Sequence, residues 1–311
     1  MNNIICIAGP TASGKTALAV ELAKELDGEV ISCDSMQIYR RMDIGTAKPT
    51  REEMQGIVHH MIDIADPDED FSVSRYCEMA TPMVDDILSR GKTAIIAGGT
   101  GLYMDALIKG NDFAPYPATG ARERLEQQAD EMGMDFMLTK LREIDPESAA
   151  RLHLADRKRI IRALEVYEET GQTITAHNKR TQSIPPRYQP LWIGLDFEPR
   201  QTLYERINLR VDLMLQQGLV KEIQELLASG IPAKCTAMQA IGYKEFVAAL
   251  DGNGTIEDAA QEVCKASRHY AKRQLTWFRR NPDMNWLVRR DGEGFPEILA
   301  QARQLVRQFD K

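Results

Sequence analysis

An eight-residue string near the N-terminus, Gly9 to Thr16, could bind phosphate groups. It fits the pattern G-x-x-x-x-G-K-[ST], follows a short apolar run and precedes apolar residues at helical spacing. In such a loop the backbone N–H groups point at phosphate oxygens, and the positive end of the following helix adds to their pull. Lys15 would supply a mobile charge, and Thr16 could hold a Mg²⁺. The sequence therefore predicts a phosphate site of the kind found in nucleotide-binding proteins.

A carboxylate follows the next apolar run. Glu29 to Cys33 leads directly into Asp34, which a parallel sheet would bring to the same carboxyl edge as the phosphate loop. Asp34 is thus a candidate for proton transfer, with a helix N-cap as the alternative. The run Thr93 to Ala97 ends instead in two glycines and Thr100, without the aspartate that usually holds magnesium in nucleotide hydrolases. Thr100 could meet a ligand there or simply cap a helix.

Two stretches are much more basic than the chain as a whole. Residues 151 to 162 carry five cations against one acid, and residues 265 to 280 carry six cations and no acid. The second stretch also holds Tyr270, Trp277 and Phe278. Cations that meet phosphates and aromatic rings that stack on bases favour binding to single-stranded RNA loops, whereas a solvated helix face is the alternative for each stretch.

Two further polar groups are less specific. The segment from Met42 to Pro49 places Asp43, Thr46 and Lys48 around one glycine, which is compatible with a functional loop or a mobile surface loop. The pair His59-His60 has no third ligand at metal spacing, so we expect an edge position in a strand.

The elements that must position these residues follow an α/β pattern, with short β-branched runs alternating with helical stretches. Expected strands are Ile4 to Ala8, Glu29 to Cys33, His60 to Ile64, Thr93 to Ala97 and Leu191 to Leu195. Expected helices are Lys15 to Leu26, Ser74 to Ser89 around Pro82, Pro199 to Gln217, Val220 to Ser229 and Ile256 to about Arg280. The pattern predicts a P-loop NTPase-like parallel sheet flanked by helices.

An inserted all-helical subdomain should interrupt this sheet. The chain becomes turn-rich around Asn111 to Gly120, with Pro115 and Pro117, and is then helical in pattern from Ala121 to Thr170. The proline-rich stretch Thr181 to Pro190 should be the return linker. We therefore predict a core domain of residues 1–114 and 191–311 and a helical insertion of residues 115–190.

Composition limits the classes of protein. The chain has 311 residues, 43% of them hydrophobic and 27% charged, which is typical of a folded globular protein. Its net charge of −7 means that an RNA partner must bind a local basic face. Five scattered cysteines favour a reducing compartment, and the uncharged first three residues and short apolar runs predict neither a signal peptide nor a membrane span. We expect a cytoplasmic protein.

Eight strings together resemble the tRNA dimethylallyltransferases, also called tRNA isopentenyltransferases. They lie in the family's order over nearly the whole chain. The strings are GPTASGKT at 9–16, Asp34-Ser35-x-Gln37-x-Tyr39, MDIGTAKP at 42–49, HHMIDI at 59–64, GGTGLY at 98–103, RKRIIRALEV at 157–166, IGYKE at 241–245 and KRQLTWFR at 272–279.

The resemblance implies transfer of a dimethylallyl group from dimethylallyl diphosphate to the exocyclic N6 amine of the adenosine 3′ to the tRNA anticodon. Asp34 would be the base, with Thr100 and Lys15 also catalytic and Thr16 on Mg²⁺, in a monomer. Residues implied in diphosphate binding are Gly9, Thr11, Ala12, Ser13, Gly14, Lys15, Thr16 and Arg210.

The resemblance also implies contacts to the anticodon stem-loop, some of them from the helical insertion. At Gln239 this chain departs from relatives, in which a basic residue is common. The implied tRNA contacts are Asp34, Ser35, Met36, Gln37, Arg122, Lys158, Arg159, Ile160, Ile161, Arg162, Gln239, Gly242, Tyr243, Lys244, Lys272, Arg273, Gln274, Trp277 and Arg279.

The residues agree with such chemistry but leave alternatives. A carboxylate can take a proton from a weakly nucleophilic adenine amine, and a phosphate loop can stabilise a departing diphosphate without ATP. A P-loop small-molecule kinase would use Asp34 on an acceptor hydroxyl, but it leaves the acid-free basic stretch unexplained. A prenyltransferase acting on free adenine nucleotide would not need the basic cluster at 157–162.

Overall fold

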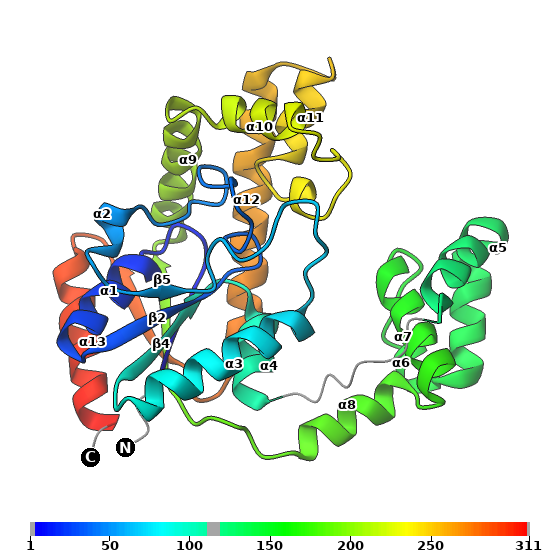
Figure 1. The fold of residues 1–311 in the computed structure, drawn as a ribbon, viewed down its shortest axis with the longest axis horizontal. Helices are drawn as coiled ribbons and strands as arrows, with labels where there is room; N and C mark the ends of the chain where they lie inside the picture. Colours follow the sequence, from blue (N-terminus) through cyan, green and yellow to red (C-terminus); the bar gives the residue numbers. More distant parts are fainter. Residues whose placement is uncertain (1–3, 111–118, 310–311) are drawn as a thin grey trace. The chain divides into compact units, whose positions relative to one another are not determined.

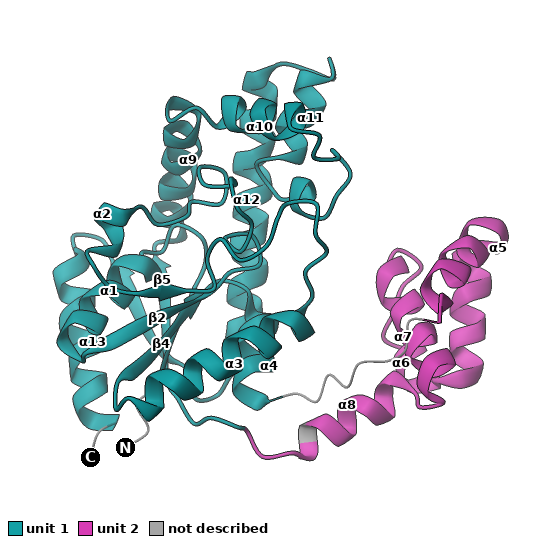
Figure 2. Cartoon of the chain, viewed as in Figure 1, with its two compact units in different colours: residues 1–110, 187–311 teal, residues 111–186 magenta. Residues whose placement is uncertain are grey.

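The computed structural model describes residues 4–110 and 119–309, and in them the predicted α/β architecture with an all-helical insertion is confirmed (Figure 1). The first three residues and the turn predicted around Pro115 and Pro117 lie outside the described residues. Two compact units emerge from the contacts: residues 1–110 with 187–311, and residues 111–186 (Figure 2). Each end of the insertion thus falls four residues earlier than the sequence predicted.

Six parallel strands form the sheet of the core domain, in the order β3-β2-β4-β1-β5-β6. The inner strands are almost wholly buried, as expected for runs of Ile, Val and Ala covered on both faces. Their bounds are β1 Ile4–Ala8, β2 Gly28–Cys33, β3 His59–His60, β4 Thr93–Gly98, β5 Leu191–Glu198 and β6 Asn285–Arg290.

Helices cover both faces of this sheet. One hydrophobic cluster packs α1 and α13 against one face of the sheet. A larger cluster packs α3, α4 and the helices α9 to α12 against the other face. The bounds are α1 Lys15–Glu25, α2 Arg51–Met54, α3 Val73–Ser89, α4 Gly101–Lys109, α9 Arg200–Gln216, α10 Leu219–Ala228, η1 Ala237–Gln239, α11 Lys244–Leu250, α12 Ile256–Phe278 and α13 Phe295–Phe309.

The helical unit has a core of its own. Leu125, Met137 and Leu141 from one helix pack against Ile160 and Leu164 from another. Its helices are α5 Ala121–Ile144, α6 Pro146–Ala149, α7 Arg157–Thr170 and α8 Ile174–Ser183. A separate core explains why the insertion forms a compact unit.

The structure corrects two local predictions and adds two elements that were not predicted. The strand expected over His60 to Ile64 ends at His60, because Met61 and Asp63 have positive φ angles that a strand does not allow. Thr181 and Ser183 belong to α8, not to the return linker, because the Thr173 side chain caps that helix and starts it ahead of the prolines. Strand β6 and helix α13 escaped the sequence analysis.

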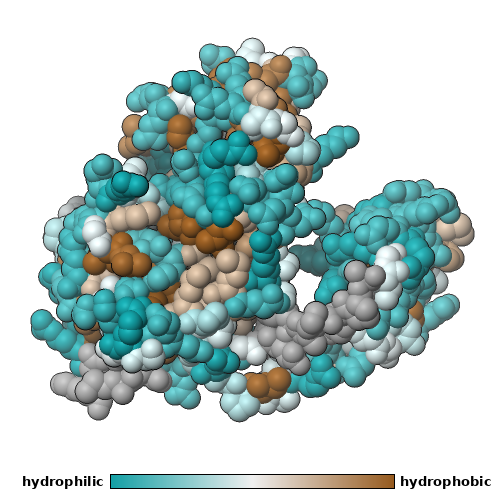
Figure 3. Space-filling view, in the orientation of Figure 1, coloured by the Kyte–Doolittle hydropathy of each residue, from teal (hydrophilic) through white to brown (hydrophobic). Residues whose placement is uncertain are grey.

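Among the described residues, no helix is long and apolar enough to cross a membrane. Hydrophilic residues cover most of the face of the molecule drawn in Figure 3, with hydrophobic residues in separate patches.

The predicted edge position of the histidine pair is confirmed, and it belongs to an ionic cluster. His60 in edge strand β3 and Arg90 and Lys92 before β4 all surround Glu29 in β2, whose side chain is 7% exposed. The hydrogen bond from Arg90 is the main influence; it outweighs burial and, with His60 and Lys92, holds the pKa of Glu29 well below its usual range. The cluster therefore stabilises the fold through an ionised Glu29.

We predict that Glu29→Gln lowers the free energy of unfolding at pH 7 by about 1 to 3 kcal/mol, because half-exposed cations lose a buried partner. A carboxyl with a depressed pKa stabilises the fold above its unfolded pKa of about 4.3 and loses this effect as pH falls. Urea unfolding from pH 7 to pH 3 should therefore show the difference shrinking below about pH 4.3. A difference that stays constant down to pH 3 would show that ionisation of Glu29 does not matter.

Candidate active site

The phosphate loop lies between β1 and α1 and is closed on itself. Lys15 Nζ donates to the carbonyl oxygens of Gly9 and Pro10 at 3.1 and 2.8 Å. Burial, the main cause, and the nearby Arg210 lower the pKa of Lys15 to about 8, while Asp34 partly opposes them. Gly14 begins the helix in the left-handed conformation without a side-chain cap, so the first N–H groups of α1 remain available to an anion.

Two arginines of α9 reach the loop from the side. Arg206 Nε donates to the Ala12 carbonyl at 2.9 Å, and Arg210 Nη1 contacts the Thr11 hydroxyl at 3.4 Å. Burial is the main cause that lowers the pKa of Arg206 and of Arg210. The charge of Arg289 lowers the pKa of Arg206 further, and the charge of Arg206 lowers that of Arg210. The two guanidinium groups thus converge on the loop without a carboxylate within ion-pair distance in the described structure, which favours an anionic ligand.

A cavity of about 240 Å³ borders the phosphate loop. Ser13, Arg206 and Arg289 line it, and the buried Ser13 hydroxyl has no hydrogen-bond partner in the described structure. The guanidinium groups of Arg206 and Arg289 lie near the ring of Phe197, at 5.5 and 5.9 Å. Arg289 thus adds positive charge near the loop to that of Arg206 and Arg210.

The side chain of Gln274 in α12 fixes the loop against the end of β4. Its Oε1 accepts from the Thr11 N–H at 2.9 Å, and its Nε2 donates to the Gly99 carbonyl at 3.0 Å. A Cβ on Gly99 would overlap that amide, so the glycine is needed for the close approach. Because the Thr11 N–H is bonded to Gln274, a ligand would meet the Thr11 hydroxyl and not this N–H.

Asp34 and Thr100 lie side by side at the carboxyl ends of β2 and β4. Asp34 Oδ1 accepts from the Met36 N–H at 2.9 Å, which fixes the carboxylate in a tight turn and not at a helix N-cap. The Thr100 hydroxyl accepts from the Ser35 N–H at 3.0 Å and makes no cap bond to α4. The capping alternatives for both residues are therefore wrong.

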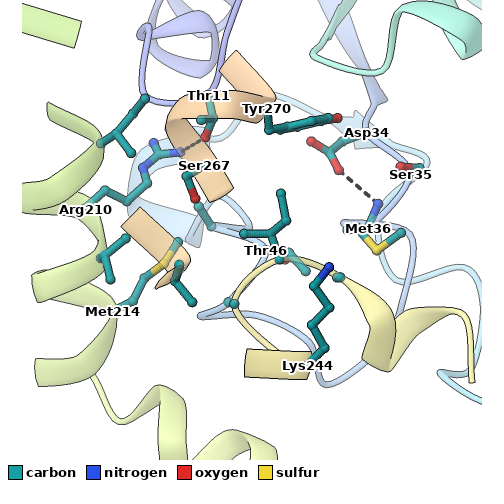
Figure 4. A pocket seen from close by; sticks show the side chains of 18 of the residues that line it. Thr11, Asp34, Ser35, Met36, Thr46, Arg210, Met214, Lys244, Ser267 and Tyr270 are labelled. Atoms are coloured by element: carbon teal, nitrogen blue, oxygen red, sulfur yellow. Dashed lines mark hydrogen bonds between the residues drawn. The ribbon is translucent and has the colours of Figure 1, made fainter. Parts of the chain in front are cut away.

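Asp34, Thr11 and Arg210 border one cavity of about 380 Å³ within the core domain. Figure 4 shows Asp34 and Tyr270 on one side of it and Arg210 and Met214 on the other. Thr11 reaches it from the phosphate loop. A carboxylate, a cation and an apolar wall are thus available to one ligand or to two adjacent ligands.

The loop from Met42 to Pro49 forms part of the cavity wall and is held firmly. Glu222 of α10 accepts N–H groups of Asp43, Ile44 and Gly45 at 2.7 to 3.1 Å, as well as the Tyr243 hydroxyl at 2.7 Å. The side chain of Lys48 is 5% exposed and donates to the Tyr39 carbonyl and two carboxylates. The alternative of a mobile surface loop is therefore wrong, since its polar residues hold the wall in place.

Several predicted RNA contacts line the cavity or its rim. Ser35 and Met36 line it from the turn after β2, Gln239, Gly242 and Lys244 from the η1–α11 segment, and Arg273 from α12. Lys272 is exposed on α12, and Arg279 is exposed directly after that helix; Lys272 lies over Tyr204, and Arg279 pairs with Asp196 at 2.9 Å.

Six other predicted contacts have a different role. The side chains of Ile160 and Ile161 are fully buried in the helical unit, and Tyr243 is buried against Gly45. Gln274 is 6% exposed and holds the phosphate loop. These four side chains lie in the interior and take part in packing or in holding the phosphate loop, and their contacts to RNA stay predictions.

Gln37 is the fifth. Its amide accepts from the Ser32 hydroxyl and donates to the carbonyls of Thr46 and Ala47, so it supports two residues that line the cavity. The half-buried Trp277 packs against Gly101 and donates to Asp105 at 3.0 Å, so its indole N–H is occupied within the protein.

Cations of the helical unit lie at its surface. Lys158, Arg159 and Arg162 are exposed on α7, and Arg122 is exposed on α5. Arg122 and Arg162 share Glu165 as an ion-pair partner, at 3.4 and 3.0 Å. Glu165 is buried, whereas the side chains of both arginines are about half-exposed, so each guanidinium group is accessible to a polyanion from solvent.

Sequence reasoning missed the contributions of Glu222, Arg206 and Arg289. Glu222 lies on an ordinary helical stretch, and nothing in its spacing points to a loop about 180 residues earlier. Arg206 was visible only as the helical partner of Arg210 four residues on, a spacing that places both on one helix face.

In the protein without a bound anion, the pKa of Lys15 is lowered to about 8. We therefore predict that affinity for inorganic diphosphate falls as pH rises through about 8. The anion favours the charged lysine, so binding near pH 8.5 should also take up protons. Lys15→Ala should bind roughly ten- to 100-fold more weakly at pH 7 and lose this pH dependence. Calorimetric titration in buffers of different ionisation enthalpy measures both effects; a wild-type curve parallel to that of Lys15→Ala would refute the assignment.

Comparison with known proteins identifies the family. The IPP transferase family model matches residues 37–281. A tRNA dimethylallyltransferase from Acetivibrio thermocellus is 45% identical over 99% of both chains. A solved full-length tRNA isopentenylpyrophosphate transferase from Bacillus halodurans is 43% identical over 99% of this chain and 96% of its own, with a TM-score of 0.75. A eukaryotic dimethylallyltransferase acting on tRNA is 29% identical, with a TM-score of 0.82, over 97% of this chain and 78% of its own. With its P-loop core and these matches, the chain belongs to the IPP transferase family, the family of the tRNA dimethylallyltransferases.

Proposed function

We propose that this protein transfers a dimethylallyl group from dimethylallyl diphosphate to the N6 amine of the adenosine 3′ to the anticodon in tRNA, forming N6-isopentenyladenosine. The observation that carries the proposal is a single cavity with a carboxylate, Asp34, on one side and Arg210 beside the phosphate loop on the other. One side suits an amine that must lose a proton, and the other suits a diphosphate that must leave.

Asp34 is proposed as the base. An adenine amine is a weak nucleophile because its lone pair is delocalised into the ring, so proton removal during attack lowers the barrier. The bond from the Met36 N–H holds Oδ1, and the other carboxylate oxygen remains available for the amine. The new bond joins N6 to the allylic carbon, the C–O bond to diphosphate breaks, and Asp34 takes the proton.

The phosphate loop is proposed to bind the leaving group. Negative charge develops on the bridging oxygen as the C–O bond breaks, and fixed donors and cations stabilise it. Lys15, Arg210 and the N-terminus of α1 would supply these groups, and Thr100 at the end of β4 is proposed to contact the diphosphate near the bond that breaks. Arg206 and Arg289 extend positive charge to the cavity that Ser13 lines.

A Mg²⁺ fits this site if the substrate supplies most of its ligands. The described residues contain no cluster of three acidic, histidine or cysteine ligands, and Mg²⁺ often binds through one or two protein oxygens with phosphates and water. The Thr16 hydroxyl, half-exposed at the start of α1, would hold it. Such an ion would neutralise the departing diphosphate.

tRNA is proposed to bind over exposed cations of the core domain and of the helical unit. Lys244 and Arg273 at the cavity rim and Lys272 on α12 would meet phosphates near the target base. Lys158, Arg159, Arg162 and Arg122 would hold the anticodon stem-loop from the helical unit. Action as a monomer and a cytoplasmic location, where tRNA is available, belong to the same proposal.

The alternatives are less well supported. In kinases of this fold that transfer phosphate from ATP, an aspartate at the end of a second strand typically binds magnesium. Here β4 ends at Gly98, and Gly99 and Thr100 follow it. A prenyltransferase for free adenine nucleotide would not need the exposed cations of α7. The known relatives act on tRNA by name.

We predict that Asp34→Asn slows single-turnover prenylation by roughly 10² to 10⁴, with the affinities for tRNA and donor changed little, because general-base catalysis is worth about that factor. The assay uses labelled dimethylallyl diphosphate, unmodified tRNA, Mg²⁺ and no nucleoside triphosphate, with mass analysis of the anticodon loop. Asp68→Asn, the same change at an exposed position outside the cavity lining, is the matched control. A folded Asp34→Asn protein working within about threefold of the parent rate would remove Asp34 from the mechanism.

A second prediction concerns α12. Replacing Lys272 and Arg273 by alanine should raise the KM for tRNA, leave diphosphate affinity intact and flatten the log–log salt dependence by about 0.7 for each lost phosphate contact. The control pair Lys24→Ala and Arg303→Ala removes two cations at the last turn of α1 and on α13. Equal salt slopes for both double variants would mean that α12 does not bind RNA.

A further inference from the structure

Only one of the three aromatic side chains in the basic stretch of α12 lines the cavity. Phe278 is 2% exposed in the core, and the Trp277 ring is packed against Gly101 with its N–H bonded to Asp105. Tyr270 is the sole aromatic residue in the cavity wall as far as the chain is described. The sequence predicted that three aromatic rings could stack on bases, but of these only Tyr270 lines the cavity.

Tyr270 is held next to the proposed base. Figure 4 shows its ring extending along the cavity toward Asp34. The Thr100 hydroxyl hydrogen-bonds its phenol, and the Arg273 guanidinium lies 5.4 Å from the ring centroid. Burial, the main cause, and Asp34 raise the pKa of Tyr270 to about 12, so the phenol stays neutral. Arg273 thus lies over the ring of Tyr270, and the residue also lines the cavity, where a ligand can meet it.

The opposite side of the cavity has different chemistry. Ile207, Val211 and Met214 of α9 form an apolar wall on the side of Arg210. A short prenyl chain attached to a diphosphate at Arg210 and the phosphate loop would lie against this wall. The flat ring near Asp34 is then left for the partner whose amine must reach that carboxylate.

We propose that the Tyr270 ring is the stacking platform on which the flipped-out target purine lies, with its exocyclic amine directed to Asp34. The inference rests on the proposed function and deepens it by naming the residue that positions the base. A base removed from its helical stack loses its neighbours, and enzymes recover that loss with aromatic side chains. Tyr270 is thus a positioning residue for the nucleophile.

The test uses an anticodon stem-loop RNA with 2-aminopurine at the target position. This fluorescent purine brightens when it leaves a stack and dims on an aromatic ring, and it lacks the 6-amino group, so prenylation at N6 does not interfere. The wild-type protein and Tyr270→Phe should bind it in a dim state, whereas Tyr270→Leu should leave it bright. Affinity of Tyr270→Leu for the RNA should fall roughly five- to 150-fold, the range expected for one stacked base.

Two readouts separate stacking from a purely structural role. Affinity for inorganic diphosphate should be unchanged in all Tyr270 variants, and rescue by Phe assigns the effect to the ring rather than to the bond with Thr100. Tyr167→Leu, which removes an exposed tyrosine of the helical unit, should leave the probe dim. If Tyr270→Leu does not fold, Tyr270→Met fills more of the space without an aromatic ring.

A probe that is equally dim in wild type and in the folded Leu or Met variant would overturn the proposal, as would a probe that is bright in wild type. Either result, with a wild-type protein that prenylates tRNA, would remove Tyr270 and leave the proposed function standing. Absence of prenylation by the wild-type protein on its tRNA would instead refute the proposed function.

Discussion

The buried amide of Gln274 connects the three parts of the active site. It accepts from the Thr11 N–H in the phosphate loop, donates to the Gly99 carbonyl after β4, and belongs to α12, whose outer face carries Lys272 and Arg273. A buried amide that loses a partner costs about 1 to 3 kcal/mol, so the bridge resists separation of these parts. The phosphate loop and α12 are therefore fixed to each other.

This constraint explains how one cavity can serve two very different substrates. The diphosphate needs a cationic loop, and the base needs a carboxylate and a flat apolar surface at its side. Because α12 also carries Tyr270 in the cavity wall, movement of the helix would displace Tyr270 and the phosphate loop together. The geometry of attack is then set mainly by packing in the core domain, while the exposed cations contribute affinity.

Much of the fold was predictable from the sequence because its signals are local. Buried β-branched runs predicted β1, β2, β4 and β5, and the glycine-lysine string placed the phosphate loop before α1. Strand β6 was missed because its polar, half-exposed residues resemble a loop until it pairs with β5. The contributions of Glu222 and Gln274 were missed because they depend on tertiary contacts with segments about 180 and 260 residues away. Burial likewise separates Ile160 and Ile161 from the neighbouring surface cations, a distinction that a motif does not make.

The most direct test of this account is single-turnover prenylation by Gln274→Leu, with tRNA and dimethylallyl diphosphate both saturating and tRNA affinity measured in parallel. The account predicts a rate at least about tenfold lower, since two buried hydrogen bonds that position the leaving group are lost, with tRNA affinity nearly unchanged. A folded variant that keeps the parent rate at saturation and loses only tRNA affinity would contradict it, because Gln274 would then be an RNA contact and not the link between the loop and the helix.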